Sequence, residues 1–303
     1  MPRQLRYPLP RKSMALGRRS LPTRLAVASL ALALASGSTA YESSIHQKLT
    51  FLAAKQLNRC LAGRITPPVS ALQVRMIARA NARQAETNVL VRMMRWNYYD
   101  RSGVGDRDIL WVIDTRFHEH FDQQVSKLAA AGGDAEAFPY LGRILNYVQD
   151  VTSPAHAAPV YTTRWWRLRL KDRFDEFPID EDRVAAAVRD SCAHVLANIT
   201  NYDGVLRETA ENTVTAIEAP MFGLPASWEA FWTLNEDPGK FGEYGPAGNN
   251  FGRNTRFRCG AQGRCVLLSE DPLYQEFALQ RHISAVVASM RVMLILQRQR
   301  MAP

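Results

Sequence analysis

Apolar residues recur at a helical spacing along most of the chain. The clearest stripe runs through residues 141–161, whose apolar positions are Leu141, Ile144, Leu145, Val148 and Val151. Similar spacing predicts helices over residues 44–61, 68–96, 109–131, 183–218 and 272–299, the fourth broken near residues 201–204. Few segments show the alternation of apolar and polar residues that is typical of a half-buried strand. We therefore predict an all-α fold, with one mostly helical domain over residues 41–303.

The polar residues of this first stripe have a spacing of their own. Asn146 and Asp150 are four residues apart, so both side chains leave one face of the predicted helix. Pro154 is expected to stop the helix soon afterwards. His156 follows where the chain can fold back over the helix end. The pattern predicts convergence of these three side chains, and the alternative is an amphipathic helix with a solvated polar face.

The N-terminal 40 residues have the features of a secretory signal. They contain seven basic residues and no acidic residue, and their apolar run, residues 25–35, is too short to span a bilayer. Ser38, Thr39 and Ala40 supply the small residues that signal peptidase requires. We predict that residues 1–40 are removed, which makes Tyr41 the N-terminus of a secreted or periplasmic protein. The alternative is an uncleaved membrane anchor.

The predicted cleavage also changes the charge of the protein. The formal net charge of the whole chain is +9, and removal of the seven basic residues leaves about +2. The mature chain therefore has no strong electrostatic footprint of a nucleic-acid-binding protein. After cleavage we expect no transmembrane anchor, because no other segment has the required pattern.

The C-terminal third combines turn-forming residues with cysteines. Residues 235–257 are rich in Gly and Asn, which predicts a long loop. An even number of cysteines in an exported chain indicates disulfides, and four cysteines allow three pairings. Cys259 and Cys265, flanked by glycines, are typical of a small closed loop. Cys60 and Cys192 would then join the first helix to a later one.

The spacing Asn146-x3-Asp150-x5-His156 resembles the His-x3-Asp-x5-His core of the zinc-dependent phospholipases C and related single-strand nucleases. In that family the mature chain begins with Trp, whose amine and carbonyl bind zinc together with a nearby His; here Tyr41 precedes His46 by five residues. Residues 172–175, Asp-Arg-Phe-Asp, resemble the family's Asp-x-(Phe/Tyr)-Glu segment. The resemblance implies a mostly helical fold and two or three zinc ions.

The resemblance also implies a set of site residues. The implied metal ligands are Tyr41, His46, Glu86, Asp150, His156, Asp172 and Asp175. Asn97 and Asn146 stand where the family has histidines, so one metal site departs from the family. An amide oxygen binds zinc more weakly than imidazole does, and an oxygen-rich set suits Ca²⁺, Mg²⁺ or Mn²⁺ better. A metal-free hydrogen-bond network is the other interpretation of this site.

Other histidines offer fewer candidates. His118 and His120 are two residues apart, so on a helix they do not share a face, and we expect a solvated polar surface there. Asp106 and His120 are the substitutes if Asn97 is misaligned with the family. His194 stands among apolar residues and is expected to pack in the core.

The chemistry that the resemblance implies is phosphodiester hydrolysis. Metal ions would neutralise the phosphate and activate a water molecule, which a carboxylate such as Glu86 would orient, with Asp150 at the metal centre. A phospholipid or another phosphodiester is the expected substrate, and the low charge of the mature chain disfavours a nuclease. The alternative from another functional class is a non-catalytic relative that binds a partner through a degenerate metal site.

Overall fold

The computed structural model describes residues 41–85, 99–102, 117–158, 160–161, 172–197, 201–260 and 263–301. The predicted signal peptide lies outside these residues, as do Glu86, Asn97 and Asp106. All the described residues belong to one unit of the chain, residues 37–303.

Helices account for 61% of this structure and strands for 8%, which confirms the prediction of a mostly helical domain. The α-helices are α2 (Ser43–Cys60), α3 (Ala71–Ala85), α5 (Phe117–Ala129), α6 (Asp134–Asp150), α7 (Pro154–Ala157), α8 (Glu181–Arg189), α9 (Cys192–Leu196), α10 (Tyr202–Glu218) and α11 (Pro272–Gln299). Two 3₁₀ helices are η1 (Phe174–Glu176) and η2 (Trp228–Ala230). Within the described residues, the predicted helices at 44–61 and 272–299 are confirmed almost to the residue.

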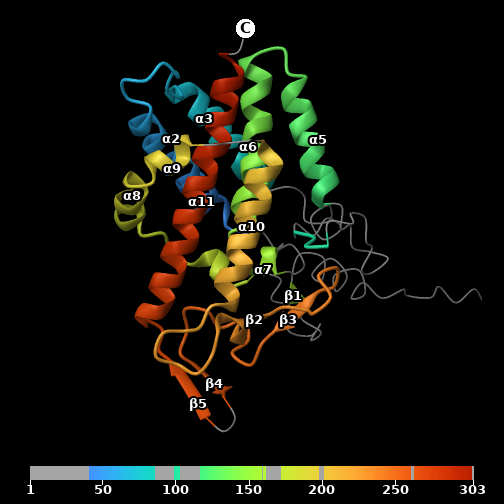
Figure 1. Cartoon of the computed structure of the whole chain (residues 1–303), viewed down its shortest axis with the longest axis vertical. Coiled ribbons are helices and arrows are strands. Elements are labelled where there is room, and N and C mark those ends of the chain that lie inside the picture. Colours follow the sequence, from blue (N-terminus) through green and yellow to red (C-terminus); the bar gives the residue numbers. More distant parts are fainter. Residues whose placement is uncertain are drawn as a thin grey trace, which may run out of the picture. The chain divides into compact units, whose positions relative to one another are not determined.

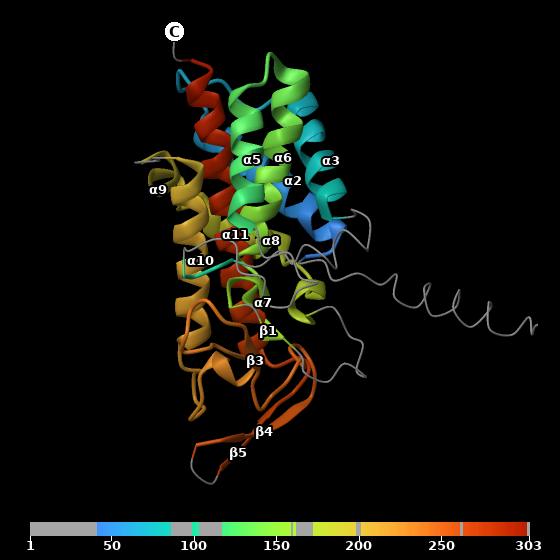
Figure 2. The ribbon, with the colours of Figure 1, turned by 90° about the vertical axis from the view of Figure 1, so that its right-hand side faces the viewer.

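The long helices lie side by side around α6 and α11 (Figures 1 and 2). Helix α6 packs between α3 and α5, and α11 packs against α2, α6, α8 and α10. By length and composition α11 is apolar enough to cross a membrane, but 67% of its most apolar window is buried inside the structure. The same pattern is found in a core helix, whose apolar side chains face neighbours on every side.

Gly142 allows an unusually close approach of α3 and α6. A Cβ atom at this position would collide with the carbonyl oxygen of Ile77 and would contact the side chain of Ala80. One turn further along each helix, Asn146 of α6 donates a hydrogen bond of 3.1 Å to Asn81 Oδ1 of α3. The absence of a side chain at Gly142 therefore brings two buried amides into contact.

The end of α6 differs from the prediction in one respect. Pro154 was expected only to stop the helix. In the structure α6 ends at Asp150, and after a three-residue connection Pro154 begins the short helix α7. A proline is favoured in the first turn of a helix, where its missing N–H would have no partner. The connection is closed by hydrogen bonds from Ser153 N to Asp150 O and from His156 N to Ser153 O. His156 is thereby buried next to the end of α6.

The region 183–218 has a second break that the apolar pattern did not predict. Helices α8 and α9 are separated at residues 190–191, before the expected break ahead of α10. At that later break Asn201 caps α10, since its side chain accepts a hydrogen bond from Gly204 N. The expectation that His194 is packed is wrong, because the short helix α9 leaves it exposed.

The predicted loop 235–257 is partly wrong, because it contains a strand and the start of another. The strands are β1 (Val160–Tyr161), β2 (Trp232–Thr233), β3 (Gly242–Tyr244), β4 (Thr255–Cys259) and β5 (Gly263–Leu267). Strand β3 pairs in parallel with β1 and antiparallel with β2, and β4 and β5 form a separate antiparallel hairpin. These strands are short, so an alternating pattern could hardly have revealed them.

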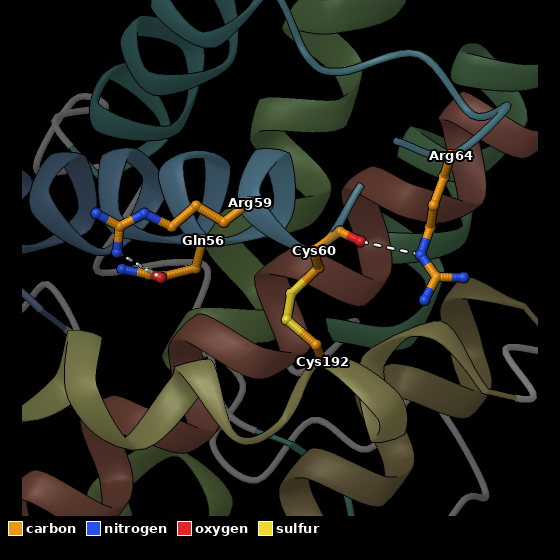
Figure 3. The surroundings of a disulfide bond; sticks show 5 residues. All are labelled: Gln56, Arg59, Cys60, Arg64 and Cys192. Carbon is orange, nitrogen blue, oxygen red and sulfur yellow. Dashed lines mark hydrogen bonds between the residues drawn. A yellow bond between two sulfur atoms is a disulfide. The ribbon is translucent and has the colours of Figure 1, made fainter. Parts of the chain in front are cut away.

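Two disulfides confirm the pairing suggested by the cysteine spacing. Cys60 at the end of α2 is bonded to Cys192 at the start of α9, across 132 residues (Figure 3). Beside this bond the side chain of Arg64 donates a hydrogen bond to Cys60 O. Cys259 is bonded to Cys265 and closes the hairpin of β4 and β5 near its tip.

Candidate functional site

The last turn of α6 buries a row of polar side chains. Asn146, Gln149 and Asp150 are all at most 1% exposed, so the alternative of a solvated polar face is wrong. His46 of α2 and Asn81 of α3 are buried against them. Burial of this many polar groups is costly unless they are paired, so the pairing of each atom decides what the site can do.

His46 is the centre of this arrangement. Its Nδ1 lies 2.7 Å from Gln149 Oε1. Its Nε2 lies 3.2 Å from Asp150 Oδ1 and 3.2 Å from Asn146 Nδ2. His46 and Asp150, two of the implied ligands and 104 residues apart along the chain, are therefore in contact.

The surrounding hydrogen bonds determine the tautomer of His46. The Thr50 hydroxyl donates to His46 O, so it accepts from Asn81 Nδ2 and Gln149 Nε2. Gln149 Nε2 also donates to Ser289 Oγ at 3.0 Å, which leaves Gln149 Oε1 as an acceptor. Nδ1 of neutral His46 therefore carries the proton, and Nε2 presents a lone pair.

Two buried oxygens next to this lone pair have no hydrogen-bond donor. They are Asp150 Oδ1 and Asn146 Oδ1. A carboxylate oxygen and an imidazole lone pair 3.2 Å apart repel each other unless a proton or a cation lies between them. Asn146 Nδ2 donates to this lone pair at 3.2 Å in the present orientation of the amide. If the amide turned so that its oxygen faced His46, the three side chains would fit one divalent cation, held by one nitrogen and by oxygens. Among the described residues, however, no group of three or more His, Cys, Asp or Glu side chains has metal-binding geometry.

Asp172 is a buried carboxylate with a full set of donors. Its Oδ1 accepts from Phe174 N at 2.8 Å. Its Oδ2 accepts from Trp232 Nε1 at 2.8 Å and from the Tyr244 hydroxyl at 2.9 Å. Burial raises the pKa of Asp172, and these three hydrogen bonds oppose that rise. Asp172 therefore anchors η1 to β2 and β3.

Asp175 lies in η1, three residues after Asp172, and has fewer donors. The Ser153 hydroxyl donates to its Oδ1 at 2.6 Å, which joins η1 to the connection after α6. Burial and the nearby charge of Asp172 raise the pKa of Asp175 well above its usual range. A charged His156 would lower the pKa of Asp172, so the predicted ligands His156, Asp172 and Asp175 are close enough to interact electrostatically.

Tyr41 lies between the two predicted ligand groups. It is fully buried, its hydroxyl is 3.0 Å from Thr152 Oγ1, and its ring packs edge-on against His46 with ring centres 5.8 Å apart. The next residue donates from its backbone N–H to Asp175 O at 3.4 Å. The predicted N-terminus is thus placed beside both groups, and burial raises the pKa of the Tyr41 hydroxyl.

The remaining predicted residues are not part of this cluster. Glu86, Asn97 and Asp106 lie outside the described residues, so their roles stay predictions. His118 Nε2 is 3.2 Å from Asp100 O, and its ring packs against Tyr99 and Phe117. His120 is half-buried on α5. Nothing in the described residues links these two histidines to His46.

The residues that orient His46 were not indicated by the sequence pattern. They are Thr50, Asn81, Gln149 and Ser289. A signal for Asn81 existed, since it continues the buried stripe of α3 through Val74, Ile77 and Ala78. A polar residue inside an apolar stripe indicates a buried hydrogen-bond partner. Ser289 lies in the same way among the buried residues of α11.

Comparisons of the chain with models of protein families, with curated proteins and with solved structures find no match in any of the three. The resemblance to the zinc-dependent phospholipases C therefore rests on the residues quoted above. The geometry of His46 and Asp150 is the structural observation that bears on it.

Proposed function

We propose that this chain is an exported, metal-dependent phosphodiester hydrolase that resembles the phospholipases C. One observation carries the proposal: a buried carboxylate oxygen without a donor, Asp150 Oδ1, lies 3.2 Å from His46 Nε2. Burying a charged oxygen without a donor is expensive, and a bound cation removes that cost. This arrangement is therefore typical of a cation-binding site and not of a group that only stabilises the fold.

The residues that would hold a cation are His46, Asp150 and Asn146, which the α-amine of Tyr41 would join after signal cleavage. Of the implied second group, Asp172 is already saturated by three hydrogen-bond donors, so only His156 and Asp175 remain as ligands there. A bound divalent cation would neutralise the charge of a phosphodiester and favour deprotonation of water. Zinc, or an ion that prefers oxygen at the Asn146 side, fits these donors.

The chain's own residues position these groups. Gln149 holds His46 by Nδ1 and so keeps its Nε2 free of a proton, as second-shell residues do for metal-binding histidines. Thr50, Asn81 and Ser289 in turn hold the Gln149 amide. Glu86, which follows α3 directly in the chain, keeps the predicted role of orienting the attacking water.

Export is part of the same proposal. Two disulfides, one of them across 132 residues, are typical of proteins that fold in an oxidising compartment. We propose a secreted or periplasmic location. Among phosphodiesters we propose phospholipids ahead of nucleic acids, since the mature chain carries a charge of only about +2.

A second candidate is a non-catalytic relative with a degenerate metal site. It is supported by the amide of Asn146, whose Nδ2 contacts both His46 Nε2 and Asn81 Oδ1. These contacts satisfy His46 Nε2 and Asn81 Oδ1 by hydrogen bonding, without a metal ion. In this case the fold would serve as a binding protein, with one metal ion or none.

The test is metal content and hydrolysis by the secreted, processed chain, with its N-terminal residue determined. After supplementation with zinc, calcium and manganese, we expect bound metal and hydrolysis of phosphatidylcholine. Both should be lost in His46→Gln and Asp150→Asn. The matched controls are His194→Gln and Asp182→Asn, which make the same changes at exposed positions. No bound metal would refute the proposal, and metal without hydrolysis of phosphatidylcholine, bis(p-nitrophenyl) phosphate or single-stranded DNA would favour the binding protein.

A further inference from the structure

The hairpin of β4 and β5 has one buried face and one exposed face. Phe257, Cys265 and Leu267 point inward and are buried. The exposed face carries Arg256, Arg258, Arg264 and Val266. Val266 is 50% exposed, and Leu268, which follows the hairpin, is 62% exposed. The exposed face therefore mixes guanidinium groups with large aliphatic side chains.

The charge of this face is not balanced by acidic residues. Residues 244–269 contain four arginines and no Asp or Glu, in a mature chain whose net charge is about +2. Among the described residues none of Arg256, Arg258 and Arg264 forms an ion pair. Arg258 and Arg264 stand directly opposite each other across the two strands. Like charges in that position destabilise a hairpin, and the adjacent disulfide holds it closed.

A second exposed tip lies beside this hairpin. Leu224 N donates to Met221 O at 3.1 Å, and Gly223 has φ +76°, which defines a tight turn with Phe222 at its outer corner. Phe222 is 90% exposed. Pro225 lies 3.9 Å from the position that a Cβ atom on Gly260 would take, so this turn reaches the tip of the hairpin. We call Phe222, Arg256, Arg258, Arg264, Val266 and Leu268 the tip surface.

We propose that the tip surface docks on membranes that contain anionic phospholipids. The apolar side chains would enter the interfacial layer, while the arginines would contact lipid phosphates. This arrangement matches a bilayer, in which anionic head groups lie outside the hydrocarbon layer. A base of a nucleic acid strand can stack on Phe222, but it would leave Val266 and Leu268 in water, whereas a bilayer takes up all three apolar side chains. Both views place β4 and β5 at the end of the helices away from α3 (Figures 1 and 2). Membrane binding by the tip surface needs no metal and does not depend on hydrolysis.

Vesicle sedimentation tests the proposal with the processed chain, kept free of metal by a chelator. We expect binding to phosphatidylcholine vesicles with about 30 mol% phosphatidylglycerol, and weaker binding to pure phosphatidylcholine. The triple variant Arg256→Gln, Arg258→Gln, Arg264→Gln should lose affinity about 100-fold, from three charges near the surface. Phe222→Ser should lose about 10-fold.

Matched controls separate this surface from general effects of charge and exposure. The variant Arg75→Gln, Arg79→Gln, Arg83→Gln removes the same charge from the exposed side of α3, and Ile65→Ser alters a side chain that is also 90% exposed. Both should bind as the wild type does. Equal losses in the control and tip variants would overturn the proposal. So would tip variants that keep vesicle binding, or that lose only binding to single-stranded DNA.

Discussion

Asp150 and Asp172 are both buried carboxylates, but they differ in the hydrogen-bond donors that surround them. Asp172 accepts three hydrogen bonds from the backbone, an indole and a phenol. Asp150 Oδ1 accepts none and faces the lone pair of His46. The difference shows that burial alone does not identify a functional carboxylate. The donors that the chain supplies, or withholds, distinguish a structural anchor from a site that is prepared for a ligand.

The reason for the difference lies in what packs against each group. Trp232 and Tyr244 point their only polar hydrogens at Asp172, from strands 60 and 72 residues further along the chain. Near Asp150, Asn81 Nδ2 donates to Thr50 Oγ1 and Gln149 Oε1, and Gln149 Nε2 donates to Thr50 Oγ1 and Ser289 Oγ. The α6 side of the site therefore has many donors, none of which satisfies Asp150 Oδ1.

Removal of the anchor should give the largest effect. Asp172→Ala leaves the Trp232 and Tyr244 donors buried without an acceptor, so we expect the free energy of unfolding to fall by on the order of 4 kcal/mol. Urea denaturation measures this change. The control Asp190→Ala, the same change at an exposed position after α8, should change it by less than about 0.5 kcal/mol. A similar small effect for Asp172→Ala would mean that Asp172 is not an anchor.

His282 lies between the Asp150 region and the Asp172 region, because its ring contacts both Tyr41 and Phe174. Its protonation therefore tests how burial between these regions affects stability. Burial lowers its pKa from 6.5 to about 4. Only the unfolded chain takes up a proton between these values, so stability is complete above pH 6.5 and falls as the pH falls toward 4. His282→Phe should reduce this loss by about 3 kcal/mol.

Urea denaturation of both proteins across this range measures the effect. Asp172 and Asp175, whose pKa values are raised, contribute a slope of opposite sign. That slope is common to the wild type and the variant, so it cancels in the difference. Parallel stability curves for the two proteins would contradict a buried neutral His282.

Gln149 sharpens the comparison on the Asp150 side. Gln149→Leu keeps most of the volume but removes the acceptor for His46 Nδ1 and the donor to Ser289, so we expect a loss of about 2 kcal/mol. Without this acceptor, the proton of neutral His46 is no longer held on Nδ1, so both tautomers should be populated. The ¹⁵N chemical shifts of the imidazole nitrogens measure the tautomer ratio. The exposed change Gln123→Leu should have neither effect. An unaltered tautomer in Gln149→Leu would show that Gln149 does not orient His46.

The smallest loss of stability is expected at Asp150 itself. Asp150→Asn removes a buried charge whose Oδ1 has no donor to lose, so the metal-free protein should be no less stable than the wild type. The same change at Asp172 should cost more, because it weakens three hydrogen bonds to a carboxylate. Thermal denaturation of both variants without metal gives the contrast. Equal losses at the two positions would remove the distinction between anchor and site.

Local chemistry allowed much of the fold to be predicted. The apolar period of residues 272–299 predicted α11, and the glycines around Cys259 and Cys265 suggested a closed loop. The strands were missed because they are short and lie where Gly and Asn dominate. For the site, the resemblance to the phospholipases C indicated His46, Asp150 and the group around Asp172, but not which carboxylate would be saturated.

The sequence by itself determined most of the long helices and the disulfide pairing that its cysteine spacing suggested, because these depend on residues near one another or on a small set of cysteines. Through its resemblance to the phospholipases C it also indicated the candidate ligands. Only the tertiary structure decided that Thr50, Asn81, Gln149 and Ser289 enclose His46 and leave Asp150 Oδ1 without a donor. Hydrogen bonds between distant segments depend on how helices pack, and a glycine at residue 142 sets part of that packing. A linear pattern contains no such distances.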